Sequence, residues 1–177
     1  ICTIEPVLPR IIYVDNLNAG DCLSGNYNIA TRQCDGTAGI KFDTLGEAEN
    51  NVSAGDTVLV RNGTYTDAST SVLDIRKIGT AQQRIVFKNY DNEYVLIDGQ
   101  GARASCIRIN PDTTIGSTVG DYVTVDGLNC INTTGVGIHV YHSDYVIIRN
   151  AEVSFSSGGT GIAVVGEAVN AIIENNS

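Results

Sequence analysis

One short segment recurs five times along the chain: three mainly apolar residues, then a charged residue, then Asn or Gly. Its copies begin at Val58, Ile85, Val123, Val146 and Ala171. A second segment, in which apolar residues flank a variable one, follows four of these copies, at residues 73–75, 107–109, 138–140 and 162–164. Copies lie 23 to 25 residues apart in the C-terminal half, and the longer spacings of 27 and 38 residues contain polar or Gly-rich stretches. This period predicts a solenoid, because stacked coils tolerate insertions in their turns.

A third short apolar run lies between the two segments in most coils, at residues 94–97, 128–130 and 151–155. Three strands per coil predict an all-β fold, a right-handed parallel β-helix of about five coils. A β-sandwich would need hairpin turns between neighbouring strands, and an α/β fold would need a helix of about a dozen residues between strands. The chain, with 19 glycines and 3 prolines, has room for one such helix.

The position after the first strand of each coil holds Asn62, Asn89, Asn150 or Asn175, with Gly127 in the remaining coil. Asn and Gly tolerate left-handed backbone geometry at a sharp corner. We therefore expect a structural column in which the stacked side-chain amides form a ladder between coils. A ladder would bury Asn62 and Asn175.

Residues 1–56 are predicted to form an N-terminal strand, a loop and a capping segment, and residues 57–177 to form the coils. The capping segment is a helix expected over residues 44–52, because an exposed coil end is a sheet edge that must be covered. Only three residues follow the strand at 171–174. We therefore expect either that the solenoid continues or that another copy stacks on this open C-terminal coil.

Five cysteines are present, an odd number. Cys22 and Cys34 bracket a polar loop without a core of its own, which predicts a disulfide between them. Cys106 and Cys130 fall in apolar stretches and are either buried thiols or a bridge, and Cys2 could pair with either one. Cysteine usage therefore favours an oxidising, extracellular setting, and the absence of Met at position 1 fits removal of a signal peptide.

The net charge of −9 limits the partners. Nucleic acid binding needs a basic patch, and the 11 basic residues are scattered. The sequence has no apolar run long enough to span a membrane. We therefore expect neither nucleic acid binding nor a membrane span.

Three stretches of the N-terminal third carry a resemblance. Residues 12–15 (IYVD), 42–48 (FDTLGEA) and 54–65 (AGDTVLVRNGTY) resemble the opening of pectate-lyase-like β-helix proteins, and the later coils are similar to the repeats of that superfamily. The resemblance implies a secreted protein that contacts polysaccharide. It also implies, for family lyases, a Lys or Arg base and calcium held by clustered acids. The opening phrase is shared by lyases, hydrolases, epimerases and non-enzymatic surface proteins, so it does not fix a reaction.

The candidate functional residues are those whose side chains point outward from the strands, because the inward ones are packed in the core. One column reads Arg61, Lys88, Asp126, Arg149 and Glu174, and such mixed charges can simply neutralise one another. The sharper hypothesis makes Lys88 or Arg149 a catalytic base beside Asp126. A second column holds Asp74, Arg108, His139 and Ala163, and we expect a carbohydrate-binding surface from Arg108, His139, Tyr141 and His142. No cluster of three or four acids is apparent in the sequence, so calcium rests on the resemblance alone and no metal site is predicted.

Asn51 and Asn132 begin sequons and are candidate glycosylation sites.

Two functions fit the predicted fold. The first is a polysaccharide-binding or polysaccharide-processing protein, of lyase or hydrolase type if it is an enzyme. The alternative is a structural or adhesive surface protein whose copies stack end to end into a filament.

Overall fold

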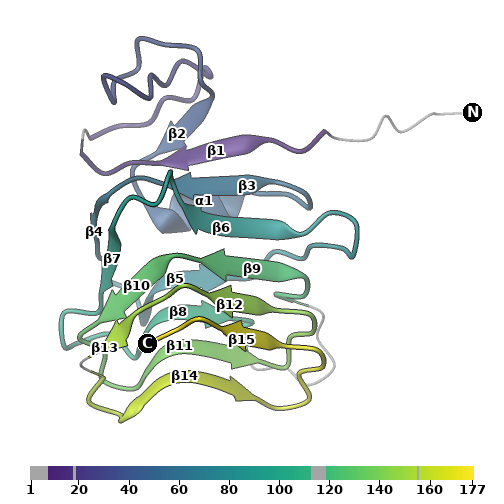
Figure 1. Cartoon of the computed structure of the whole chain (residues 1–177). Helices are drawn as coiled ribbons and strands as arrows, with labels where there is room; N and C mark the ends of the chain where they lie inside the picture. Colours follow the sequence, from purple (N-terminus) through teal and green to yellow (C-terminus); the bar gives the residue numbers. More distant parts are fainter. Residues whose placement is uncertain (1–7, 18, 113–118, 155) are drawn as a thin grey trace, which may run out of the picture.

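The computed structural model describes residues 8–17, 19–112, 119–154 and 156–177, and in them the chain winds as a right-handed parallel β-helix. All strand pairs within the named sheets of this part are parallel. Four complete coils and the first strand of a fifth stack on one another (Figure 1). The predicted fold class and the three strands per coil are confirmed.

Three sheets run along the stack in the described residues. The first contains β1 (Ile11–Val14), β2 (Ile40–Phe42), β3 (Thr57–Val60), β6 (Ile85–Asn89), β9 (Val123–Asp126), β12 (Ile147–Arg149) and β15 (Ile172–Glu174). The second contains β4 (Gly63–Tyr65), β7 (Val95–Asp98), β10 (Leu128–Ile131) and β13 (Val153–Ser154). The third contains β5 (Ser71–Ile75), β8 (Ser105–Ile109), β11 (Val136–Tyr141) and β14 (Thr160–Val165).

The core is a set of apolar rows that cross the coils. In the first sheet, Val58, Phe87, Val125 and Ile148 occupy one register position and are fully buried. Side chains alternate between the two faces of a strand, so the residues next to them in sequence point outward. The outward rows of the sheets therefore hold the side chains available to a ligand.

The predicted cap is helix α1 (Leu45–Asn51), which begins after Thr44 and ends before Val52. Thr44 and Glu47 form a capping box, in which each side chain accepts a hydrogen bond from the other's backbone N–H. Leu45 and Ala48 are buried in the common core. The helix packs against β1, β2 and β5, so it covers the first coil as expected.

Two disulfides are present among the described residues. The predicted bridge between Cys22 and Cys34 is confirmed. The sequence allowed Cys106 and Cys130 to be either buried thiols or a disulfide. They form the second disulfide, which joins the second and third coils. Cys2 lies outside the described residues.

The corner column is confirmed only in part. Asn89, Gly127, Asn150 and Asn175 share the register, and the last three have positive φ angles of 69°, 55° and 53°. Asn62 does not belong to it, because Val60 rather than Asn62 pairs with Asn89. No amide ladder forms among the described members. Asn89 donates to the Glu93 carbonyl and Asn150 to the Asp126 carboxylate, and both Asn62 and Asn175 are exposed, contrary to expectation.

Gly127 tests this corner. A Cβ at Gly127 would lie 2.6 Å from the Asn89 side chain, at a φ angle that L-residues rarely adopt. We expect Gly127→Ala to lower the free energy of unfolding by about 2–3 kcal/mol, through left-handed strain and overpacking. The matched control is Gly101→Ala, which has a similar φ of 63° but open space around the new Cβ, and should cost about 1 kcal/mol. Equal losses in denaturant titrations of the two variants would contradict the packing explanation.

Candidate functional site

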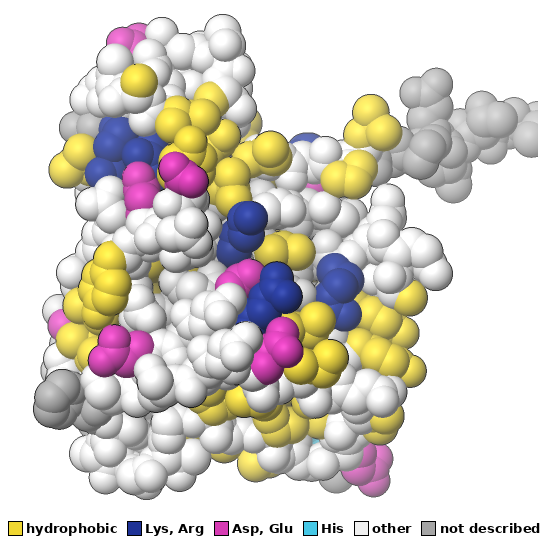
Figure 2. Space-filling view, in the orientation of Figure 1, with side chains coloured by type: hydrophobic (Ala, Val, Ile, Leu, Met, Phe, Trp, Pro, Cys, Tyr) yellow, Lys and Arg dark blue, Asp and Glu magenta, His cyan; other side chains and the backbone are white. Residues whose placement is uncertain are grey.

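Four charged residues line up on the outer face of the first sheet. Lys88, Asp126, Arg149 and Glu174 are successive register partners on β6, β9, β12 and β15. Figure 2 shows dark-blue and magenta side chains gathered over these strands in the middle of the visible face. The predicted column is therefore real from the second coil onward, but Arg61 is not part of it, because Leu59 pairs with Lys88.

Within this column Asp126 and Arg149 are bonded to each other. The Arg149 Nε atom lies 2.9 Å from Asp126 Oδ2, and Asn150 donates to Asp126 Oδ1 at 2.7 Å. Arg149 also lies within 3.8 Å of Glu174. Mutual neutralisation between coils thus explains this pair. Lys88 is exposed and makes no ion pair with the described residues, so its amine is the one among the catalytic candidates that stays available.

A groove of about 380 Å³ runs beside these charges. Its floor is a single register row, Thr57, Val86, Thr124 and Ile147. Lys88 stands on one side and Arg84 on the other. Sequence reasoning missed Arg84, which lies just before β6; its outward orientation could have been inferred from the alternation with Val86 and Lys88.

The outer face of the third sheet carries the second column. Asp74, Arg108, His139 and Ala163 are in register as predicted. Arg108 forms a two-point ion pair with Asp74, at 2.9 and 2.8 Å, and its Nε also donates to Ser71 Oγ. Burial would raise the pKa of Asp74, but the bonds from Arg108 and Ser71 outweigh it and hold the pKa below its ordinary value. Asp74 is therefore ionised at neutral pH.

Two aromatic rings adjoin this pair. The rings of His139 and Tyr141 are 3.8 Å apart between centroids, and both side chains are half-buried on the outward side of β11. Burial, and then the nearby Arg108 guanidinium, lowers the pKa of His139, so the imidazole is neutral at pH 7. His142 lies at the following turn, with φ of 42°, and its Nδ1 accepts a hydrogen bond from the Glu167 N–H. The structure thus groups Arg108, His139 and Tyr141, whereas His142 serves the turn to the next coil.

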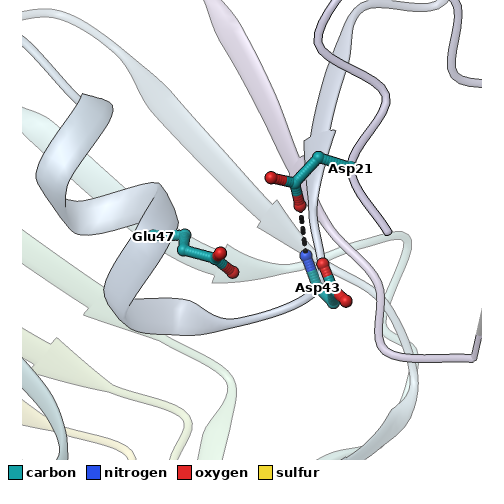
Figure 3. A group of neighbouring side chains, drawn as sticks. All are labelled: Asp21, Asp43 and Glu47. Carbon is teal, nitrogen blue, oxygen red and sulfur yellow. Dashed lines mark hydrogen bonds between the residues drawn. The ribbon is translucent and has the colours of Figure 1, made fainter. Parts of the chain in front are cut away.

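A trio of acids, Asp21, Asp43 and Glu47, meets near the cap (Figure 3), although the sequence pointed to no such cluster. Their carboxylate oxygens lie within 4.8 Å of one another. Burial and the neighbouring Asp43 and Glu47 raise the pKa of Asp21, whereas the hydrogen bond from the Gly20 N–H leads the causes that lower the pKa of Asp43. Glu47 is engaged in the capping box. Hydrogen bonds that tie the loop, β2 and α1 together account for the trio.

Calcium, implied by the family resemblance, prefers six to eight oxygen ligands. On the two outer faces, the described carboxylates of Asp74, Asp126 and Glu174 each lie next to an arginine. These two faces therefore do not offer the oxygen set that calcium prefers.

A buried polar network holds the N-terminal loop on the coils. Asp15 accepts hydrogen bonds from Arg32 and, at 2.5 Å, from the Tyr27 hydroxyl. Tyr27 in turn accepts from Arg61, which forms a two-point ion pair with Glu93 at 2.9 Å. Arg61 is thus structural, and it lies two residues beyond Leu59, which is the register partner of Lys88.

The two predicted glycosylation sites differ in their surroundings. Asn51 is exposed at the end of α1, and its Nδ2 donates to the Glu47 carbonyl. Asn132 is half-buried and donates to Asp98. Asn62, expected to be buried, is exposed. Glycosylation of Asn51 and Asn132 stays a prediction.

Comparison with known proteins finds the same architecture. A sequence model of the family described as "Pel9A-like, right handed beta helix region" matches residues 27–177. The uncharacterized protein YwoF of Bacillus subtilis (strain 168) is 32% identical over 157 residues, which are 81% of this chain and 32% of YwoF. Pectate lyase PEL9 of Emericella nidulans is 38% identical over 65 residues, or 37% of this chain and 15% of that enzyme. The chain therefore spans about a third or less of these relatives.

Solved structures agree on the fold. A rhamnogalacturonan lyase superposes with a TM-score of 0.52 and 15% identity, covering 94% of this chain and 51% of that one. The pectate lyase Pel9A also gives 0.52 and 15%, covering 85% and 40%. At this identity the likeness establishes the parallel β-helix and nothing finer.

Proposed function

The chain belongs to the family of Pel9A-like right-handed β-helix regions, and from this premise we propose that it is the polysaccharide-binding part of a secreted protein that processes pectin-type polysaccharides. Its relatives and structural neighbours include proteins named pectate lyase and rhamnogalacturonan lyase. The two disulfides are consistent with an oxidising compartment. No helix in the described part of the chain is long and apolar enough to cross a membrane.

One observation carries the proposal: strict cross-coil register brings Asp74, Arg108 and His139 into a single outward row, with the Tyr141 ring against His139. An arginine held in a fixed plane by Asp74 and Ser71 offers directional donors to sugar hydroxyls. A neutral imidazole and a phenol ring add hydrogen-bonding groups and flat apolar surface. Such a mixture of convergent polar groups and aromatic rings is typical of small-molecule and sugar recognition.

Binding can be measured by isothermal titration against polygalacturonate and rhamnogalacturonan, with a neutral glucan as the reference ligand. We expect both acidic polymers to bind and the glucan to bind more weakly. His139→Ala and Tyr141→Ala should each weaken binding roughly tenfold, which corresponds to about 1.4 kcal/mol. Thr64→Ala, an exposed position on the second sheet, is the matched control and should leave affinity unchanged. If both His139→Ala and Tyr141→Ala bind with wild-type affinity, the outer face of the third sheet is not the binding site.

The same preparation tests for activity. If the segment itself cleaves pectin-type chains by elimination, incubation with polygalacturonate produces unsaturated uronates that absorb in the near ultraviolet. End-to-end stacking into a filament, the alternative function, stays a prediction. Sedimentation velocity distinguishes it, because a monodisperse monomer would contradict it.

A further inference from the structure

Two cations without a carboxylate partner face the same groove on the first sheet. The Lys88 side chain is exposed, and its amine makes no hydrogen bond or ion pair with the described residues. Arg84 lies on the other side of Val86, and its bonds go to Thr124 Oγ1 and to the carbonyls of Val123 and Tyr145. No described carboxylate pairs with either of them. The groove is also lined by Asp126 and Arg149, which pair with each other. In a chain with 20 acidic and 11 basic residues, Lys88 and Arg84 therefore leave an excess of positive charge along this groove.

The floor between the two cations combines two threonines with two aliphatic side chains. Thr57, Val86, Thr124 and Ile147 form one row across four coils. With neighbouring strands about 4.8 Å apart, the row is about 14 Å long. A surface of this length suits the C–H faces of several linked sugar rings better than a single ring.

The cations are spaced for a ligand with more than one charge. Arg84 and Lys88 are four residues apart along an extended segment, so their Cα atoms are about 13 Å apart. The Nη1 atom of Arg84 makes no hydrogen bond with the described residues. Each cation can therefore meet a separate carboxylate of one bound chain, and simultaneous engagement raises affinity well above that of either contact alone.

We propose that this groove, between Arg84 and Lys88, is a second binding surface that recognises oligosaccharides carrying at least two free carboxylates. It is formed by the first sheet and is separate from the Asp74–Arg108–His139 row of the third sheet. This proposal depends on the proposed function in one respect, namely that the ligand is a carbohydrate. Charge complementarity selects the acidic members of that class.

The test compares ligands that differ in charge and length. Titration calorimetry of the wild-type chain uses a galacturonate oligomer, its fully methyl-esterified form and free galacturonate. We expect the oligomer to bind at least tenfold more tightly than either of the others, with affinity that falls as salt is raised. An ester that binds as tightly as the free acid would overturn the proposal.

Variants locate the effect. Lys88→Gln removes a cation whose amine makes no hydrogen bond or ion pair with the described residues. It should weaken oligomer binding at least fivefold while leaving the ester unaffected. Arg84→Lys keeps the charge but loses the bonds that hold the guanidinium, and it should weaken oligomer binding by a smaller factor. Lys77→Gln makes the same change of charge outside the groove and should stay within twofold of wild type. Wild-type affinity in Lys88→Gln would contradict the assignment.

The two proposals fail in different ways. If His139→Ala and Tyr141→Ala lose binding while Lys88→Gln does not, the groove is wrong and the third-sheet face stands. If Lys88→Gln loses oligomer binding while the ring variants keep it, the groove stands and the third-sheet face is wrong. If no ligand of the panel binds to the wild-type chain, both are wrong.

Discussion

Asp15→Asn is expected to lower the free energy of unfolding of the N-terminal part by about 3 kcal/mol. The Asp15 side chain is fully buried and accepts bonds from Arg32, Tyr27 and the Leu17 N–H. Removing its charge weakens both bonds that Asp15 accepts from the largely buried Arg32 guanidinium. Hydrogen exchange of the Tyr27 and Ala38 amides, which bond within the loop, reports this loss directly.

The effect should depend on pH. Burial acts to raise the pKa of Asp15, but the hydrogen bonds from Arg32 and Tyr27 outweigh it and hold the pKa below its ordinary value. Because the pKa of Asp15 is lower in the folded state, ionised Asp15 stabilises the fold fully above about pH 3.9, the pKa of an unfolded aspartate. This stabilising free energy is lost as pH falls through the folded-state pKa. The difference between wild type and Asp15→Asn should therefore shrink below about pH 4.

Asp35→Asn provides the control. It changes the same charge in the same loop at an exposed position, so we expect an effect within about 0.5 kcal/mol. An equal loss in both variants would show that net charge, rather than the buried network, stabilises this region.

Removal of the inner disulfide by Cys106→Ala with Cys130→Ala should cost about 3 kcal/mol. The bridge closes a loop of 24 residues and joins two successive coils. Both cysteines are fully buried in the core, so the loss should appear in unfolding of the coils followed by far-ultraviolet circular dichroism. No change in the denaturation midpoint would contradict a stabilising role for this bridge.

The outer disulfide provides the comparison. Cys22 and Cys34 are 12 residues apart in the N-terminal loop. Cys22→Ala with Cys34→Ala should increase exchange within that loop but leave the midpoint of the coils nearly unchanged, because the two sites share no coil. The contrast separates loop anchoring from coil stacking.

Much of the fold follows from local pattern. Alternation along each strand predicted which side chains point inward. The likeness of the second segments, at residues 73–75, 107–109, 138–140 and 162–164, predicted that they stack, and the register of β5, β8, β11 and β14 confirms it. The helix expected over residues 44–52 is found at Leu45–Asn51. These features depend on residues close together in the sequence.

The first coil shows where local pattern fails. Alignment by sequence places Val58 opposite Ile85, whereas the structure pairs Val58 with Phe87. A shift of two residues keeps every side chain on its own face, so hydrophobic alternation cannot distinguish the two registers. The longer turn between β6 and β7 absorbs the difference, and Arg61 and Asn62 then leave their predicted columns.

The sequence by itself therefore determined the solenoid, its period, the cap and the outward columns of the later coils, because these depend on residue type and spacing along one strand. Only the tertiary structure decided the bridge between Cys106 and Cys130, the pairing of Arg149 with Asp126 and of Arg108 with Asp74, and the groove between Arg84 and Lys88. The partners in these contacts come mostly from different coils. Which of these residues meet depends on the length of the turns and on the register between coils. Neither of these can be inferred from the alternation of side chains along a single strand.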